Sequence, residues 1–416
     1  MSAAGQPASA AGRAPLKSLD DALAELMTLA QPLTDQEEVA LFAADGRVLA
    51  QDLVSPLQVP PQDNSSMDGY AVRCADLAAG LALPVSQRIA AGACGTALAS
   101  NSVARIFTGA PIPAGADAVV PQEDCALQDD GRVLFTRTVP VGAWIRRSGE
   151  DVTRGAVVLA TGARLTPAEL GLAASIGASR VPVVRRPRVA LFSTGDELVM
   201  PGDVPPRDMP PGAIYNSNRF FLRALLMRLG CEVSDLGIVP DQRQATVAAL
   251  QAAAQDHDLI LTSGGVSVGE EDHIKPAVQA LGHLDLWQIA IKPGKPFAYG
   301  RVGAAHFMGL PGNPVSSFVT FLLLVRPFLL KLQGVKRYTS PSVTARAAFS
   351  WPKADKRREF LRARRNADGS LALFPNQSSG VLTSTVWADG LVDNPPGQVI
   401  QPGDTVRFVA LAELLS

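Results

Sequence analysis

The feature that most constrains the fold is a regular alternation of strand-like and helix-like segments between residues 188 and 334. Short apolar runs such as "RVALFS", "DLILTS" and "AHFMGL" are typical of buried strands. Longer segments such as "NRFFLRALLMRLG" and "QATVAALQAAAQD" lie between them and are typical of helices. This alternation predicts an α/β domain with a doubly wound, mostly parallel sheet that is covered by helices on both faces.

The segments on either side of this region predict smaller domains. "SLDDALAELMTLA" predicts a helix capped by Ser18, and "LTPAELGLAASIGA" predicts another that is capped by Thr166. Short apolar runs separated by Gly and Pro predict β structure in the second quarter of the chain and at its C-terminus. We therefore expect a disordered tail at 1–15, a discontinuous N-terminal linker domain of helices and strands at 16–69 and 141–187, a β-rich domain at 70–140, the α/β domain at 188–334 and a small C-terminal β-barrel at 335–416.

Composition excludes several classes of protein. The net charge is −1 and the pI is about 6.5, so no global basic field exists to attract nucleic acid or a membrane surface. The four cysteines form no CxxC pair and the four histidines no HExxH motif, which argues against a zinc site. The apolar stretch "FVTFLLLVRPFLL" is interrupted by Arg326 and Pro327 and is shorter than the ~20 residues of a membrane span. The N-terminus lacks the apolar core of a signal peptide, and we expect a cytoplasmic protein.

The loop "TSGGVSVGEEDHIK" is almost a phosphate-binding P-loop. Gly264 and Gly269 have the P-loop spacing, but Glu270 stands where the lysine belongs. Four other unusual loops also follow predicted strands, and ligands of open α/β sheets bind outside the carboxyl ends of the strands. These loops are "STGDEL", "VPD" (239–241), "KPGKP" (292–296) and "LPGNP" (310–314).

The side chains in these loops suit a phosphorylated ligand with Mg²⁺. Backbone N–H groups at Gly264 and Gly265 and the hydroxyls of Ser263 and Ser267 are donors for an oxyanion. Lysines supply positive charge, and carboxylates beside phosphate donors are typical of a bridging Mg²⁺. Ordinary turns and helix-start acids remain alternatives for single motifs. The lysines are Lys292 and Lys295, and the acids are Glu197, Asp241, Glu271 and Asp272.

Several longer motifs occur in a fixed order along nearly the whole chain from about residue 16. They are "SSMDGYAV", "IFTGAPIPAGADAVVPQED", "IRRSGEDV", "STGDEL", "TSGGVSVGEED", "IAIKPGKPFAYG" and "LPGNPVSSFV". Together they resemble the molybdopterin molybdenumtransferases, the bacterial molybdenum-insertion family, and are similar to the E domains of gephyrin and of the plant protein Cnx1. The resemblance implies that adenylated molybdopterin and molybdate react with a divalent metal, Mg²⁺, and that AMP leaves as molybdenum cofactor forms. It also implies a homodimer whose cleft lies between the α/β domain of one subunit and the β-rich domain of the other.

The resemblance assigns roles to individual residues. Acids after the glycine-rich loop, Asp272 first and Glu271 second, are the expected Mg²⁺ contacts, and Glu270 departs from the family's aspartate. The C-terminal "RREFLR" is expected to complete the oxyanion site, with a solvated strand face as the alternative. Turn chemistry is the alternative for Asp151. The catalytic set is Asp68, Thr108, Asp151, Glu197, Asp241, Asp272, Lys292 and Lys295; the binding set is Ser263, Gly264, Gly265, Ser267, Pro311, Pro314, Arg357, Arg362 and Ser379.

Besides a nucleotide-binding regulator, two other functions remain open at this point. The first is a molybdopterin adenylyltransferase, whose relatives have a loop more like TGGTG than the "TSGGVSVG" found in this chain. The second is a catalytically inactive scaffold like gephyrin, which would be free to lose Lys292, Lys295 and Asp272. The adenylyltransferase is also a possible partner of an insertion enzyme. The motifs do not distinguish molybdate from tungstate.

Overall fold

The computed structural model describes residues 16–265, 273–339 and 341–415, and the predicted disordered tail lies outside them. The chain divides into two compact units. Unit 1 comprises Met1–Glu37, Gly46–Ala50 and Val183–Ser416, and unit 2 comprises Glu38–Asp45 and Gln51–Pro182. The finer division into four folded domains stays a prediction.

A six-stranded sheet forms the centre of unit 1. Its first four strands are parallel, whereas β20 is antiparallel to both of its neighbours. The sheet is therefore mixed, and the sequence analysis missed β20. Its run "PFAYGRV" is joined to the next strand by the short turn at Gly303, so no helix separates the two strands. The order is β16 (Glu232–Val239), β13 (Arg188–Thr194), β17 (Leu259–Ser263), β21 (Ala305–Leu310), β20 (Pro296–Val302) and β18 (Gly282–Gln288).

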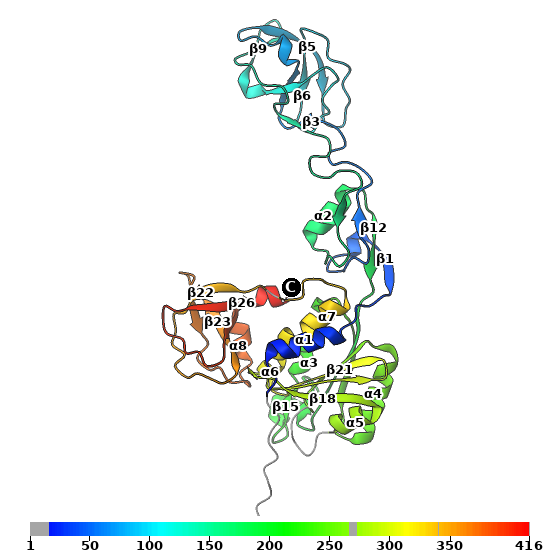
Figure 1. The fold of residues 1–416 in the computed structure, drawn as a ribbon, viewed down its shortest axis with the longest axis vertical. Coiled ribbons are helices and arrows are strands. Elements are labelled where there is room, and N and C mark those ends of the chain that lie inside the picture. The colour runs from blue at the N-terminus through cyan, green and yellow to red at the C-terminus, as the bar shows by residue number, and fades with distance from the viewer. Residues whose placement is uncertain (1–15, 266–272, 340, 416) are drawn as a thin grey trace, which may run out of the picture. The chain divides into compact units, whose positions relative to one another are not determined.

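Helices cover both faces of this sheet, as predicted. Strand β13 sends Ala190 and Phe192 into the apolar cluster formed with α4 (Arg243–Asp256) and α5 (Ile274–Leu281). The residues between them, Val189 and Leu191, belong to the cluster on the other face, because side chains alternate along a strand. That face carries α1 (Leu19–Leu29), α3 (Asn218–Arg228), α6 (Pro314–Thr320) and α7 (Arg326–Leu332) (Figure 1).

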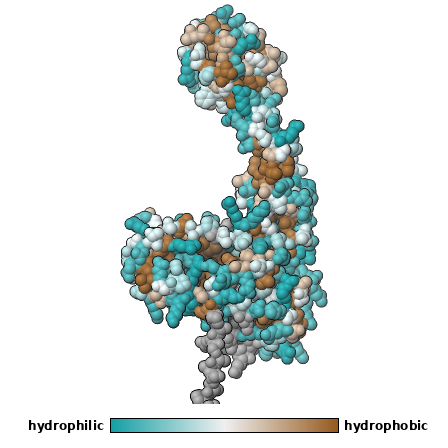
Figure 2. All heavy atoms as spheres, in the orientation of Figure 1, coloured by the Kyte–Doolittle hydropathy of each residue, from teal (hydrophilic) through white to brown (hydrophobic). Residues whose placement is uncertain are grey.

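The closing helix runs from Pro314 to Leu332 and contains a π-helical turn, Phe321–Val325. Pro327 has no N–H to donate to the preceding turn, which explains an irregularity at this place. The helix is long and apolar enough to cross a membrane, but 89% of its most apolar window is buried inside the protein. The prediction of a buried core helix is confirmed. On the face shown in Figure 2, hydrophilic and hydrophobic side chains are interspersed over unit 1.

The C-terminal part of unit 1 is a second sheet that takes one strand from the α/β region. Strand β19 (Ile291–Lys292) pairs in parallel with β23 (Arg358–Arg365). A bridge between Ala347 and Leu371 joins two distant strands of this sheet, and closure into a barrel stays a prediction. The order is β19, β23, β25 (Gly390–Asn394), β26 (Thr405–Ala410) and β22 (Val343–Arg346), with β24 (Leu371–Leu373) paired to β23. The short helices α8 (Thr383–Trp387) and α9 (Leu411–Leu415) complete this part.

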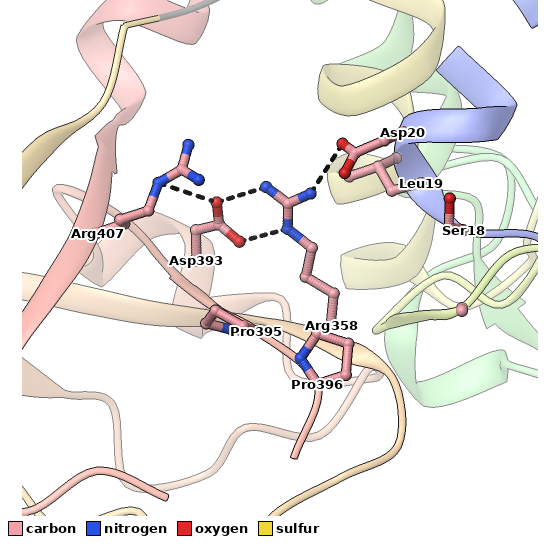
Figure 3. Close-up of a pocket in the computed structure, with 9 residues that line it drawn as sticks. Ser18, Leu19, Asp20, Arg358, Asp393, Pro395, Pro396 and Arg407 are labelled. Atoms are coloured by element: carbon pink, nitrogen blue, oxygen red, sulfur yellow. Dashed lines mark hydrogen bonds and ion pairs between the residues drawn. The ribbon is translucent and has the colours of Figure 1, made fainter. Parts of the chain in front are cut away.

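Arg358 of the C-terminal sheet forms an ion pair with Asp20 of helix α1. Ser18 caps the helix by accepting the N–H of Asp21, as predicted. The Arg358 guanidinium donates to both carboxylate oxygens of Asp393, at 2.6 and 2.7 Å, and to Asp20 at 3.0 Å (Figure 3). Arg407 is the second cation beside Asp393. These charges compensate one another around a groove of about 400 Å³.

Unit 2 is rich in β structure, as predicted for its central part. Its main sheet has the order β7 (Ala118–Pro121), β4 (Gly69–Val72), β6 (Val103–Ile106), β5 (Ala82–Ile89), β9 (Arg132–Phe135) and β8 (Cys125–Leu127). Two short ladders pair β10 (Ile145–Arg146) with β3 (Asn64–Ser65) and β11 (Val157–Leu159) with β2 (Leu53–Val54). Helix α2 (Pro167–Ser175) begins with a capping box between Thr166 and Glu169. Strands β1 (Gln36–Ala40) and β12 (Arg180–Val184) pair where the chain passes between the units.

Candidate functional site

The loops singled out in the sequence meet at one edge of the central sheet. Strands β13, β16, β17 and β21 are mutually parallel. Strand β18 runs in the same direction, because two antiparallel pairings separate it from β21. The five loops that follow these strands therefore leave the sheet at the same edge, which is where ligands of such sheets bind.

Three of these loops enclose a cavity of about 560 Å³, which lies within the usual size range of small-molecule sites. The short parallel strands β14 (Leu198–Val199) and β15 (Ile214–Tyr215) form another wall, and the C-terminal part adds Gly380 and Leu382. The polar side chains that line the cavity are those of Ser193, Thr194, Glu197, Tyr215, Asn216, Ser217, Asn218, Ser263 and Asn313.

An amide at the start of α3 joins the loops after β17 and β21. Nδ2 of the buried Asn218 donates to Ser263 Oγ at 2.8 Å and to the Gly312 carbonyl at 2.7 Å. The Gly264 N–H donates to the Leu310 carbonyl at 3.0 Å. Gly264 has a φ of 94°, and a Cβ there would lie 2.9 Å from the Thr194 carbonyl oxygen. Only glycine permits this close approach of backbones, which makes the "GG" pair a structural requirement of the cavity wall.

Lys292 belongs to a separate cluster of charged side chains on the C-terminal sheet. Its Nζ lies 2.9 Å from Glu359 Oε1 and 3.4 Å from Asp355 Oδ2. The other oxygen of Glu359 accepts the indole N–H of Trp351 at 2.7 Å, and this carboxylate is completely buried. Arg357 donates from Nε and Nη2 to Asp355, at 3.0 and 2.9 Å.

The ion pair between Arg357 and Asp355 shifts the pKa of both side chains. The guanidinium of Arg357, assisted by Lys292, holds the pKa of Asp355 well below its usual range. Asp355 in turn raises the pKa of Arg357. With two cations and two anions, this cluster holds its basic groups in fixed positions at the surface of the C-terminal part.

The other predicted C-terminal residues have structural contacts. Arg362 is only 1% exposed, so the alternative of a solvated strand face is wrong for it. Its guanidinium donates to the Phe360 and Ser378 carbonyls and to Ser384 Oγ, and burial lowers its pKa to about 10. The carbonyl of Ser379 accepts the N–H of Val315 in the first turn of α6, so this loop is docked on the α/β part.

The predicted residues of unit 2 form one compact contact. Asp68 Oδ1 accepts both the N–H and the hydroxyl of Thr108, each at 2.8 Å, which lowers the pKa of Asp68. Asp151 is exposed, and its N–H donates to the Val59 carbonyl. Asp68 and Thr108 are thus brought together, while Asp151 lies in a turn.

The remaining predicted residues have different places. Ser267, Glu271 and Asp272 lie outside the described residues. Gly265 continues the glycine turn with a φ of 67° and Lys295 is half-buried in the "KPGKP" turn. Asp241 is half-buried just after β16, Pro311 is buried, and Pro314 is the first residue of α6. Within the described ranges, no group of three or more His, Cys, Asp and Glu side chains is placed to hold a metal ion.

Comparisons with known proteins cover all folded parts of the chain. Residues 17–177 match the family described as the MoeA N-terminal region (domain I and II), 190–331 a probable molybdopterin binding domain, and 344–411 the MoeA C-terminal region (domain IV). The chain is 45% identical to the molybdopterin molybdenumtransferase of Haemophilus influenzae over 83% of this chain and 85% of that protein. It belongs to the molybdopterin molybdenumtransferase family. The resemblance found in the sequence motifs is confirmed.

Further relatives agree with this membership. Molybdopterin molybdenumtransferase 2 of Mycobacterium tuberculosis is 38% identical over 90% of this chain and 93% of its own length. The crystal structure of the molybdopterin biosynthesis moeA protein from Pyrococcus horikoshii OT3 has a TM-score of 0.82 at 28% identity and covers 95% of this chain and all of its own. The multidomain architecture with mixed sheets is therefore that of the molybdopterin molybdenumtransferase family.

Sequence reasoning missed several residues of this site. Asn216 precedes α3 and Asn218 is its first residue; asparagine is ordinarily a helix cap at such places, so their type gave no signal. Ser193 was part of the quoted motif "STGDEL" but stands inside a strand rather than in the loop. No sequence motif indicated Asp355, Glu359 or Trp351. The pairing of β19 with β23 in the structure brings them to Lys292. Asp355 stands four residues before Glu359, and no motif marked either residue.

Proposed function

We propose that this member of the family is a molybdopterin molybdenumtransferase that inserts molybdate into adenylated molybdopterin. In this reaction water adds across the P–O–P bond of the pyrophosphate, so that AMP leaves and a phosphate stays on the pterin side. The two thiols of the dithiolene bind molybdenum and lose their protons as one molybdate oxygen leaves as water. The observation that carries the proposal is the convergence of three strand-end loops on one cavity in a domain whose family is described as a probable molybdopterin binding domain. The identity of 45% to a transferase of this name supports it.

The residues of this chain contribute mainly position and charge. The Gly264 N–H is used by the Leu310 carbonyl, so hydroxyls and amides of the cavity wall such as those of Ser263 and Asn313 orient the substrate. A fixed geometry of this kind lowers the barrier by ordering the reactants beforehand. Lys292, Lys295 and Arg357 supply positive charge to the oxyanions, molybdate and phosphate. The carboxylate of Glu359 keeps the Lys292 ammonium in one position before substrate arrives.

The acids that the sequence places after two of these strands are the expected contacts of a divalent metal. In the sequence, Asp241 follows β16, and Glu271 and Asp272 follow the glycine-rich loop. Mg²⁺ prefers hard carboxylate oxygens of this kind. When bound, Mg²⁺ would neutralise charge on the phosphates. We further propose a cytoplasmic homodimer in which Asp68, Thr108 and Asp151 of unit 2 act on the substrate, and a transient contact with the adenylyltransferase that supplies it.

One assay tests this function against its two rivals. The purified protein is mixed with adenylated molybdopterin, and AMP is measured with molybdate and Mg²⁺ together and with each one left out. We expect AMP release that needs both. An adenylyltransferase would instead release pyrophosphate from ATP and molybdopterin, and a scaffold would release neither product. Lys292→Ala should slow AMP release, and the exposed Lys356→Ala beside it serves as the matched control.

A further inference from the structure

Arg105 lies beside the contact between Asp68 and Thr108 in unit 2. It stands on β6, opposite Tyr70 of β4 in the antiparallel pairing of these two strands. Asp68 is the residue before β4, and Thr108 is the second residue after β6, so both lie just beyond the end of this ladder. Their arrangement therefore depends on side-chain contacts as well as on the paired strands.

The guanidinium of Arg105 connects the ends of β4, β6 and β7. It donates from Nη1 to the Gly69 carbonyl at 3.1 Å and from Nη2 to the side-chain oxygen of Gln122. Gly69 begins β4, while Gln122 follows β7 and donates its own N–H to the Asp68 carbonyl at 3.0 Å. A Cβ at Gly69 would lie 2.0 Å from the Val120 carbonyl oxygen, so β4 and β7 are very close here. The backbone that carries the Asp68 side chain is thus held by Arg105 and by the glutamine that Arg105 binds.

Two aromatic rings restrict the orientation of this guanidinium. Its central carbon lies 5.1 Å from the ring centroid of Tyr70 and 4.7 Å from that of Phe107, and cations are attracted to the faces of such rings. Arg88, the parallel neighbour of Arg105 on β5, lies 4.5 Å over the same Phe107 ring. Within the described part of the chain, Arg88 has no hydrogen bond or ion pair. Arg88 therefore shares the charge and the ring contact of Arg105 but not its two hydrogen bonds.

The carboxylate of Asp68 has one occupied and one available oxygen. Oδ1 accepts both hydrogen bonds from Thr108, and Oδ2 has no hydrogen-bond partner among the described residues. The bonds from Thr108 and, to a lesser extent, the charge of Arg105 lower the pKa of Asp68, so the group is ionised at neutral pH. A charged oxygen in a fixed direction is then available to a hydrogen-bond donor of a bound molecule.

We infer that Arg105 is a positioning residue for the proposed reaction, which holds Asp68 and Thr108 in the arrangement that acts on the substrate. The planar fork of a guanidinium donates to two acceptors at fixed angles, which a lysine ammonium does not reproduce. Small displacements of a group that acts on the substrate are costly in rate. The inference rests on the proposed function and adds to it a residue that stands one position before the motif "IFTGAP".

The test measures steady-state AMP release from adenylated molybdopterin by the full-length protein in the presence of molybdate and Mg²⁺. Arg105→Lys keeps the charge but loses the fork that binds Gly69 and Gln122. We expect kcat to fall about tenfold or more and KM to change by less than about threefold, because Arg105 itself does not bind the substrate. Arg88→Lys is the matched control on the neighbouring strand and should stay within about twofold of wild type, because it removes no such bond.

Two further measurements separate positioning from a general loss of structure. In an Asp68→Asn background, Arg105→Lys should lower kcat by less than about a further twofold, because the group that Arg105 positions is already altered. The Thr108 amide donates to Asp68, and its hydrogen exchange should be about tenfold faster in Arg105→Lys and unchanged in Arg88→Lys.

Four results would overturn the inference. They are a kcat of Arg105→Lys within about twofold of wild type, an equal loss in Arg88→Lys, a loss that persists in full in the Asp68→Asn background, and unchanged exchange of the Thr108 amide in Arg105→Lys. A wild-type protein that releases no AMP would refute the proposed function and this inference together. An active wild type with an unaffected Arg105→Lys variant would refute this inference alone.

Discussion

The buried carboxylate of Glu359 provides a direct test of how the charged cluster is built. Its two oxygens accept from Lys292 Nζ at 2.9 Å and Trp351 Nε1 at 2.7 Å, and no part of the residue is exposed. Glu359→Ala removes both hydrogen bonds, together with a longer one from Asn394 Nδ2 at 3.4 Å, and leaves the indole N–H without its acceptor. Each hydrogen bond to a charged group contributes about 1.5–3 kcal/mol, and breaking a buried pair by removing one partner costs about 3–5 kcal/mol.

Because the chain has more than one compact unit, the stability lost in Glu359→Ala is best measured locally, by hydrogen exchange of the amides in β23 and β25. A decrease of about 3–5 kcal/mol in the free energy of opening corresponds to exchange that is faster by roughly two to four orders of magnitude. Glu359→Gln keeps the shape of the side chain and an acceptor for the indole N–H of Trp351, so this variant should lose less stability than Glu359→Ala. Lys356→Ala, an exposed change in the same segment, should alter the free energy by less than about 0.5 kcal/mol. Exchange in Glu359→Ala that rises no more than in Lys356→Ala would refute the reasoning.

Three further predictions concern single residues. Ser193→Ala should leave the free energy of unfolding unchanged or raise it, since the buried hydroxyl has no partner among the described residues; a clear loss of stability would contradict this. Burial lowers the pKa of His306 to about 4, so the unfolded chain binds more protons between pH 6.5 and 4, and stability should fall by about 3 kcal/mol as the pH drops through that range. His306→Gln should flatten this part of the stability profile, which urea titration at several pH values measures. Asp68→Asn and Thr108→Val should each lower the rate of AMP release, and the double variant should lower it by less than the two effects combined, because the residues share one contact.

The sequence predicted most of the central fold because the signals there are local. Ser18 and Thr166 cap the helices that they were expected to cap, and the apolar runs around Val189 and Ile260 form buried parallel strands. Strand β20 was missed because it belongs to a hairpin, in which no helix separates the strands. Strand β25, "GLVDN", was missed because its pairing with β23 depends on residues 27 to 35 positions away.

The site was predictable where the loops carry special residue types and not where partners are distant in sequence. Gly264, Ser263 and Glu197 stand in recognisable strand-end motifs, and all three line the cavity. The partner of Lys292 is 67 residues further along the chain and came from no motif. Arg362 resembled a member of a solvated basic run, but residues 359–363 of β23 are all buried, so both faces of the strand are covered at this place.

The parallel pair formed by β19 and β23 has a consequence for dividing the protein into pieces. The two residues of β19 come from the α/β region, yet they form the edge of the C-terminal sheet and carry Lys292 to Glu359. A truncation before residue 335 would leave Lys292 without its buried counterion, and an isolated C-terminal fragment would have an open sheet edge, which favours aggregation. Chimeras that exchange the C-terminal region between relatives should therefore carry residues 289–296 with it, although these lie 39 to 46 residues before the apparent boundary at residue 335.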